Sequence, residues 1–256
     1  MRQINRELAR RFIRDKRAEG ASPATVKGYQ SCLGVYWSWL EDKRLVEPDV
    51  WINHRVEAGD DEGDKRPFTD NEVKVLLQGP APLLIKDLMM LAALTGMRRS
   101  EITNLKVGNC KGAVFDVQGG KTKAARRRIP IHSDLEEIVT RRCAGKRDDE
   151  YLLEGLSSPA SRGASGRGSK LGEVFTKYRR KVGVDDRQSG DGQSLVDFHS
   201  FRRWFCTKAE QAGIQEHLIA SVVGHTRKGM TFGRYSAGPS DAQRRSVVDA
   251  VSLPGL

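Results

Sequence analysis

The sequence predicts an α+β protein in which a small helical N-terminal domain is joined by a linker to a larger, mainly helical domain with a small antiparallel sheet. Apolar residues at helical spacing dominate the 256-residue chain, and only 113–117 and 128–131 read as strands. The segment 59–66 is charged and almost free of apolar residues, so it is unsuited to a core. We therefore expect domains at 1–58 and 67–256.

The N-terminal domain is expected to hold three helices. The first covers 4–19 and ends at Gly20, and the second begins at Ser22-Pro23, with serine as N-cap and proline in the first turn. A short third helix is expected over 50–56. The second helix carries an apolar face that we expect to pack in a core rather than to stack on bases: Val26, Tyr29, Leu33, Tyr36, Trp37 and Leu40.

In the second domain, Thr69 and Glu72 form a capping box before an apolar run, and a buried helix over 83–94 stops at Thr95-Gly96. The two strands flank a lysine-rich hairpin at 119–123. Glycine and serine at 157–169 and polar residues at 185–194 predict loops. Further helices are expected at about 100, 134–142, 170–182, 197–212, 214–223 and 240–251.

Composition narrows the class of protein. The net charge of +11 favours a polyanionic partner, and no apolar run approaches the roughly 20 residues of a membrane helix. The first 17 residues are charged throughout, unlike a secretory signal. We expect a cytoplasmic protein with reduced thiols and with no metal or cofactor, because the four cysteines are scattered: Cys32, Cys110, Cys143 and Cys206.

One ordered set of residues carries chemistry: Arg98, Lys121, His199, Arg202, His225 and Tyr235. Cutting a phosphodiester requires a nucleophile, charge on the non-bridging oxygens and a proton for the leaving oxygen. Arginine forks hold phosphate oxygens bidentately, and a tyrosine ester conserves the bond energy so that strands can be rejoined without ATP. A lysine on the hairpin can protonate the leaving 5′ oxygen; Lys123 competes with Lys121 for that role.

Other basic residues are candidates for contact with a nucleic-acid backbone. Each of them can equally lie on a solvated face, and the run 126–128 is open to both interpretations. The candidate DNA-binding residues are Arg10, Arg14, Lys27, Lys123, Arg126 and Arg128.

The order and context of these motifs resemble the tyrosine recombinase family, particularly the phage-type integrases. The matching segments are Thr95–Ile102, the hairpin lysine, His199–Arg202, Val223–His225 and Phe232–Tyr235. His225 and Tyr235 are one residue further apart than in the commonest family pattern, which a loop around 227–229 can absorb.

The resemblance implies a site-specific recombinase or integrase for a mobile element of a bacterium or phage. Residues 1–58 would be a DNA-binding core-binding domain, and 67–256 the catalytic domain with its C-terminal tail from about 237. Tyr235 would attack a phosphate activated by the other five residues and form a 3′-phosphotyrosyl link, without metal or ATP. The family acts as a homotetramer on two double-stranded DNA sites, through a Holliday junction and sometimes with DNA-bending accessory proteins. The tail would dock on a neighbouring subunit or fold back on its own domain.

Two other functions remain open. A type IB topoisomerase shares the nucleophile, but its enzymes usually carry a basic residue of another type at the position of His199. A non-catalytic DNA-binding protein with the same fold has no need of a nucleophilic tyrosine. Both considerations favour the recombinase.

Overall fold

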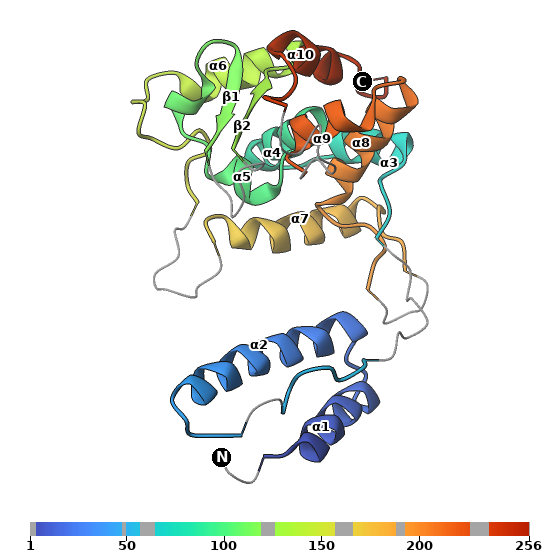
Figure 1. The fold of residues 1–256 in the computed structure, drawn as a ribbon. Helices are drawn as coiled ribbons and strands as arrows, with labels where there is room; N and C mark the ends of the chain where they lie inside the picture. The colour runs from blue at the N-terminus through green and yellow to red at the C-terminus, as the bar shows by residue number, and fades with distance from the viewer. Residues whose placement is uncertain are drawn as a thin grey trace. The chain divides into compact units, whose positions relative to one another are not determined.

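The computed structural model describes residues 4–47, 50–56, 65–118, 126–156, 166–187, 193–225 and 236–255. The chain divides into two compact units, Met1–Asp64 and Lys65–Leu256 (Figure 1). None of the helices among the described residues is long and apolar enough to cross a membrane.

The first two helices of unit 1 begin where the sequence predicts. Helix α1 (Arg6–Ala18) is capped by Asn5, and α2 (Pro23–Asp42) by Ser22, whose side chain accepts a hydrogen bond from the Thr25 amide at 3.2 Å. Both caps satisfy amides that have no partner inside the helix.

The apolar face of α2 is narrower than expected. Val26, Trp37 and Leu40 are buried and Leu33 is partly buried. Tyr29 and Tyr36 remain 44% and 49% exposed, so the expectation that they pack in the core is wrong. Tyr36 instead stacks on Trp39, with ring centroids 5.9 Å apart. A single packed helix covers one stripe of α2, which leaves side chains beside that stripe in water.

The helix expected over 50–56 is absent, since these residues form turns and extended backbone. Asn53 adopts a left-handed conformation with φ 59°, which interrupts a helix. The His54 ring hydrogen-bonds the Val50 carbonyl at 2.6 Å and so replaces the backbone amide that a helix would supply. The Gln30 side chain donates to two further carbonyls of this segment and holds it against α2.

Unit 2 is a helical domain built around one buried helix, α4 (Leu83–Thr95), whose apolar residues face inward on nearly all sides. The other helices are α3 (Asp70–Gln78), α5 (Arg99–Thr103), α6 (Glu136–Cys143), α7 (Ser169–Lys181), α8 (Ser200–Gln211), α9 (Glu216–Val223) and α10 (Asp241–Asp249), with short 3₁₀ turns at Val107–Cys110 and Ser133–Leu135. Helix α4 packs against α3, α5 and α8.

A two-stranded antiparallel sheet completes unit 2. Strands β1 (Val114–Val117) and β2 (Arg127–Pro130) pair in a register that places Phe115 opposite Ile129. Both of these side chains are fully buried. The small antiparallel sheet predicted from the sequence is therefore confirmed, and β2 ends at Pro130, whose nitrogen cannot donate to a sheet.

The C-terminal tail folds back on its own unit. Helix α10 packs against α9 and β2, and Val247, Val248 and Val251 are fully buried in the main core. The Arg245 guanidinium also donates a hydrogen bond to the Ile131 carbonyl, at 2.6 Å. Figure 1 shows α10 in red beside the strands.

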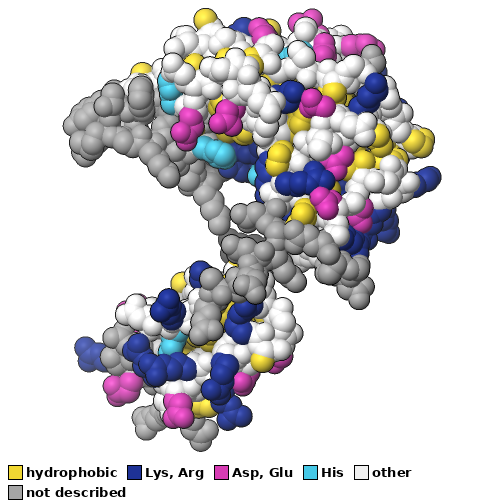
Figure 2. Space-filling view, turned by 90° about the vertical axis from the view of Figure 1, so that its right-hand side faces the viewer, with side chains coloured by type: hydrophobic (Ala, Val, Ile, Leu, Met, Phe, Trp, Pro, Cys, Tyr) yellow, Lys and Arg dark blue, Asp and Glu magenta, His cyan; other side chains and the backbone are white. Residues whose placement is uncertain are grey.

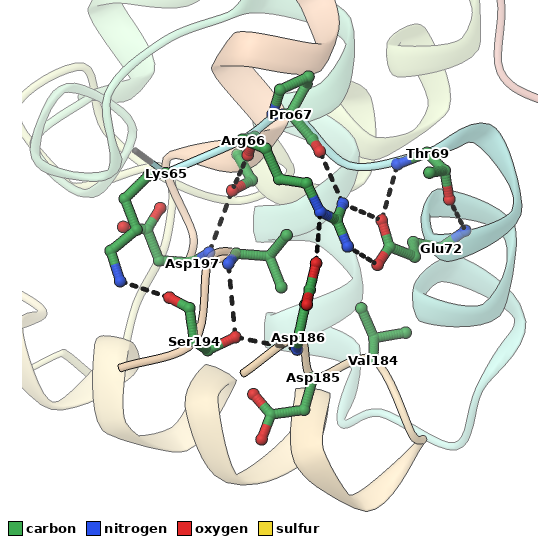
Figure 3. Close-up of polar contacts among 12 residues, drawn as sticks. Lys65, Arg66, Pro67, Thr69, Glu72, Val184, Asp185, Asp186, Ser194 and Asp197 are labelled. Carbon is green, nitrogen blue, oxygen red and sulfur yellow. Dashed lines mark hydrogen bonds and ion pairs between the residues drawn. The ribbon is translucent and has the colours of Figure 1, made fainter. Parts of the chain in front are cut away.

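Two residues of the predicted linker belong to unit 2. The Arg66 amide donates to the Leu195 carbonyl at 2.9 Å, and the Lys65 ammonium donates to the Ser194 carbonyl (Figure 3). The Arg66 guanidinium pairs with the carboxylates of Glu72 and Asp186. The low apolar content of this segment predicted a linker, but Arg66 joins unit 2 because acidic partners in that unit pair with its charge.

Candidate active site

The site is organised by the turn that ends α4. Gly96 has φ 60°, and a Cβ built there would lie 2.8 Å from the Phe205 ring and 2.9 Å from Val223. Only glycine meets both conditions, the left-handed backbone and the close approach of α8 and α9. The turn leads directly to Arg98, which stands at the N-cap of α5.

Arg202 lies on α8 and is only 2% exposed. Its Nη1 donates to the Gly96 carbonyl at 2.8 Å, whereas its Nη2 is buried and has no hydrogen-bond partner among the described residues. Burial, followed by the charge of Arg98, lowers the pKa of Arg202 to about 10, so the guanidinium remains charged at neutral pH. A buried cationic donor without an acceptor is uncommon, and a charge-assisted hydrogen bond to an anion would satisfy it.

Glu101 connects two arginines. Its carboxylate accepts from the Arg98 Nη1 at 2.9 Å and from the Arg98 amide at 2.9 Å. The same carboxylate accepts from two nitrogens of Arg127, at 2.9 and 3.1 Å. Burial opposes ionisation of Glu101, but the hydrogen bonds and charges of Arg127 and Arg98 outweigh it and lower its pKa. Glu101 is therefore ionised at neutral pH, and its carboxylate holds the Arg98 side chain in place.

Neither Glu101 nor Arg127 is among the site residues predicted from the sequence. Arg127 stands in a basic run that suggested a solvated strand face or a DNA contact, yet its side chain is 4% exposed. Its Nε also donates to the Val222 carbonyl. The available signal was the period of two along the strand, which places Arg127 on the same face as the buried Ile129.

His199 and His225 stand at helix ends beside the arginines. His199 is the N-cap of α8, and His225 follows Gly224, whose left-handed φ of 78° ends α9. Both residues are exposed overall, yet surrounding protein atoms partly desolvate their rings and lower the pKa of each. The charges of Arg202 and Arg98 lower both values further, so the four side chains form one electropositive group.

Three predicted site residues, Tyr235, Lys121 and Lys123, lie outside the described residues. Among the candidate DNA-binding residues that are described, all are exposed: Arg10, Arg14, Lys27, Arg126 and Arg128. Arg128 pairs with Asp241 at 3.2 Å. Figure 2 shows Lys and Arg side chains spread over the visible face of unit 1. Within the described ranges, no group of three or more His, Cys, Asp or Glu side chains is placed to hold a metal ion.

The fold is shared with solved integrases. The phage lambda integrase dimer bound to a COC′ core site aligns with TM-score 0.65 at 17% identity, over 94% of this chain and 69% of that chain. The integrase of transposon Tn1549, in complex with circular intermediate DNA, aligns with TM-score 0.64 at 15% identity, over 95% of this chain and 84% of that chain. At these identities the likeness concerns the fold alone.

Sequence comparison identifies the family. Relatives include a XerC-like tyrosine recombinase of Caldanaerobacter subterraneus, 20% identical over 85% of this chain, and the tyrosine recombinase XerA of Pyrococcus horikoshii, 26% identical over 65%. The alignments span only 63% and 55% of the lengths of these curated relatives. The model of the phage integrase family matches residues 67–239, which is more than half of the chain. The chain therefore belongs to the phage integrase family, the tyrosine recombinases.

Proposed function

We propose that the protein is a site-specific DNA recombinase that cleaves and rejoins strands through a 3′-phosphotyrosyl intermediate, for integration or excision of a mobile element. One observation carries the proposal: the buried Arg202 guanidinium keeps an unsatisfied Nη2 beside Arg98, His199 and His225. Two guanidinium cations, two imidazoles and one unsatisfied N–H donor are groups that can stabilise the pentacovalent phosphate of a strand-transfer reaction.

The arginines bind the scissile phosphate in this proposal. Arg202 offers Nη2 from a position shielded from water, where a charge-assisted hydrogen bond is strong. Arg98 is 39% exposed at the side chain and shares its Nη1 with Glu101, so its remaining nitrogens are available to a phosphate oxygen. Both cations neutralise charge that grows on the non-bridging oxygens in the transition state.

Tyr235 is the proposed nucleophile, and the imidazoles handle protons. The lowered pKa values of His199 and His225 keep both rings neutral at physiological pH, so each ring can accept a proton or donate an N–H to the phosphate. Lys121 is the proposed general acid for the leaving 5′ oxygen, with Lys123 as the alternative.

DNA is the proposed partner of both units. The exposed cations Arg10, Arg14 and Lys27 of unit 1 would contact the phosphate backbone, as would Lys123, Arg126 and Arg128 in unit 2. Arg128 would exchange its surface pair with Asp241 for a phosphate, at little cost because both side chains are exposed. Binding would weaken steeply with salt, since each such contact releases counterions.

Assembly follows the family in this proposal. A lambda integrase tetramer has been solved on a Holliday junction, and its fold matches this chain with TM-score 0.64. We propose a homotetramer on paired recombination sites in the bacterial cytoplasm, with DNA-bending accessory proteins where the sites require them. Exchange of the tail between subunits would require α10 to leave the core in which it now lies.

The proposal is tested with a nicked suicide duplex bearing the ends of the encoding element, in magnesium and in EDTA. We expect a covalent protein–DNA band that survives EDTA and is lost in Tyr235→Phe. Tyr151→Phe removes a phenol from unit 2 outside the site and serves as control. Arg202→Lys should bind DNA but form far less of the covalent band, because an ammonium lacks the bidentate fork.

The assay also separates the alternatives. DNA binding without a covalent band, in wild type as in Tyr235→Phe, would overturn the proposal in favour of a binding module. Relaxation of supercoiled DNA lacking the element's ends would instead indicate a topoisomerase.

A further inference from the structure

We propose that Ser200 is a positioning residue for strand cleavage: it fastens the start of α8, and with it His199 and Arg202, to the segment 65–68. We call this segment the strap. The inference rests on the proposed function, because it gives His199 and Arg202 their importance. It adds a residue that makes no contact with the phosphate.

Ser200 is tied to the strap by its side-chain hydroxyl and by its backbone carbonyl. The side chain is fully buried; its Oγ donates to the Arg66 carbonyl at 2.7 Å and accepts from the Asp197 amide at 3.0 Å. The Phe68 amide donates to the Ser200 carbonyl at 3.5 Å. One serine thus bridges the strap and the turn that precedes α8.

The strap is itself firmly held. The Arg66 guanidinium makes two hydrogen bonds of 2.8 Å to the Glu72 carboxylate and one of 2.7 Å to Asp186 (Figure 3). Phe68 is 3% exposed and packs edge-on against Phe201, with ring centroids 4.8 Å apart. A hydroxyl that bonds to such a segment is anchored to a fixed point rather than to a movable loop.

Besides Ser200, the start of α8 is held by the packing of Phe201 on Phe68 and by the hydrogen bond from Arg202 to the Gly96 carbonyl. However, the N-cap of α8, His199, makes no side-chain capping hydrogen bond, so the first turn of α8 lacks the contact that usually keeps a helix start from fraying. His199 directly precedes Ser200, and Arg202 follows two residues later. A displacement of about 1 Å at a reacting group can slow a reaction about 100-fold. Loss of the Ser200 hydroxyl should therefore act on cleavage more than on folding.

The experiment compares Ser200→Ala with Ser194→Ala in the full chain. Ser194 is a matched control: it is also buried, and its Oγ bonds Arg179 and the amides of Asp186 and Val196. Ser194→Ala keeps the backbone carbonyl to which Lys65 of the strap donates. Single-turnover cleavage of the suicide duplex is measured at saturating protein, with DNA affinity and thermal unfolding in parallel. The rate constant reports positioning, whereas partial misfolding lowers the amplitude.

A second readout does not depend on activity. NMR titration follows the His199 ring, assigned by its loss in His199→Gln. The charged groups that face this ring are Arg202, Arg203, Arg98 and Asp197. Release of the helix start would move the ring toward water and away from the arginines, so its pKa should rise toward 6.5 in Ser200→Ala but not in Ser194→Ala.

We expect Ser200→Ala to lower the cleavage rate constant about 10- to 100-fold at unchanged amplitude and affinity, with Ser194→Ala near wild type. Equal rate constants and equal His199 titrations in the two variants would overturn the inference while leaving the proposed function intact. If wild type forms no Tyr235-dependent product, the proposed function fails, and the NMR comparison alone decides whether Ser200 positions His199.

Discussion

Arg202 donates from Nη1 to the carbonyl oxygen of Gly96 at 2.8 Å, which joins α8 to the turn at the end of α4. The carbonyl at a helix C-terminus has no partner within its helix, so this bond satisfies it. The bond also fixes the plane of the guanidinium and leaves Nη2 as the unsatisfied donor. Gly96 therefore allows the close packing at the end of α4, and its carbonyl orients the Arg202 guanidinium.

Replacing Gly96 by alanine should destabilise unit 2 strongly. The new Cβ would meet Phe205 at 2.8 Å and Val223 at 2.9 Å, on a backbone at φ 60°. Strain and overpacking together should cost about 2–4 kcal/mol in the free energy of unfolding. Gly213→Ala is the control, because Gly213 has φ 80° but open space around its Cβ, and it should cost only about 1 kcal/mol. Urea denaturation measures both, and equal losses would refute the packing argument.

Glu101→Gln should reveal the cost of a broken buried ion pair. It leaves the Arg127 guanidinium, 4% exposed, without its carboxylate, and should destabilise the protein by about 3 kcal/mol. Asp148→Asn breaks the exposed pair with Lys111 and should cost less than about 1 kcal/mol. Chemical denaturation at pH 7 compares the two. Similar losses would mean that burial does not govern the Glu101 pair.

The same carboxylate predicts a pH dependence of stability. The pKa of Glu101 in the folded protein lies below its ordinary value of 4.5, so its stabilisation is complete above about pH 4.5. That stabilisation is lost as pH falls through the lower folded-state value. The difference in unfolding free energy between wild type and Glu101→Gln should therefore shrink as denaturation is repeated at decreasing pH below 4.5. A difference that stays constant there would show that Glu101 keeps an ordinary pKa.

His225 should titrate below 6.5, because partial burial and then the charges of Arg202 and Arg98 lower its pKa. Arg98→Gln removes one of these charges and should raise the NMR titration midpoint of His225. Arg128→Gln removes an exposed arginine that is not among the groups acting on His225, and should leave the midpoint unchanged. An equal shift in both variants would point to net charge rather than to the local cluster.

The packing of α10 predicts that, in the free protein, the tail stabilises its own unit. Val248→Ala, at a fully buried position, should cost about 2 kcal/mol, whereas Val35→Ala, 72% exposed, should change stability by less than about 0.5 kcal/mol. The thermal midpoint of the free protein should not vary with protein concentration. A midpoint that rises with concentration would indicate tails exchanged between subunits.

Local signals in the sequence predicted local structure well. The Thr69–Glu72 capping box is confirmed at both hydrogen bonds, 2.7 and 3.2 Å, because its partners lie three residues apart. The buried helix before Gly96 and the small sheet were predicted for the same reason, namely that periodicity is a property of neighbours in the chain.

Features set by distant partners were not predictable in this way. Arg167, within a segment whose composition predicts a loop, donates to carbonyls of Thr103, Leu153 and Leu156 and lies 3.7 Å from the centre of the Tyr151 ring. Nothing in its neighbours in sequence distinguishes it from a solvated arginine. The burial of Arg127 and the exposure of Tyr29 were unpredictable for the same reason, since tertiary packing determines how exposed each side chain is.

Because α10 packs in the core of its own unit, it limits the length of chain that leads from this core back to Tyr235. Five residues lie between Tyr235 and Asp241, and a fully extended chain over these six Cα–Cα steps spans at most about 22 Å. On the other side, His225 ends a segment anchored through the buried Val223. If Tyr235 is the proposed nucleophile, fastening of both flanks to one core would make its attack on a phosphate held by the same chain an intramolecular step, with an effective concentration on the order of millimolar that dilution would not lower.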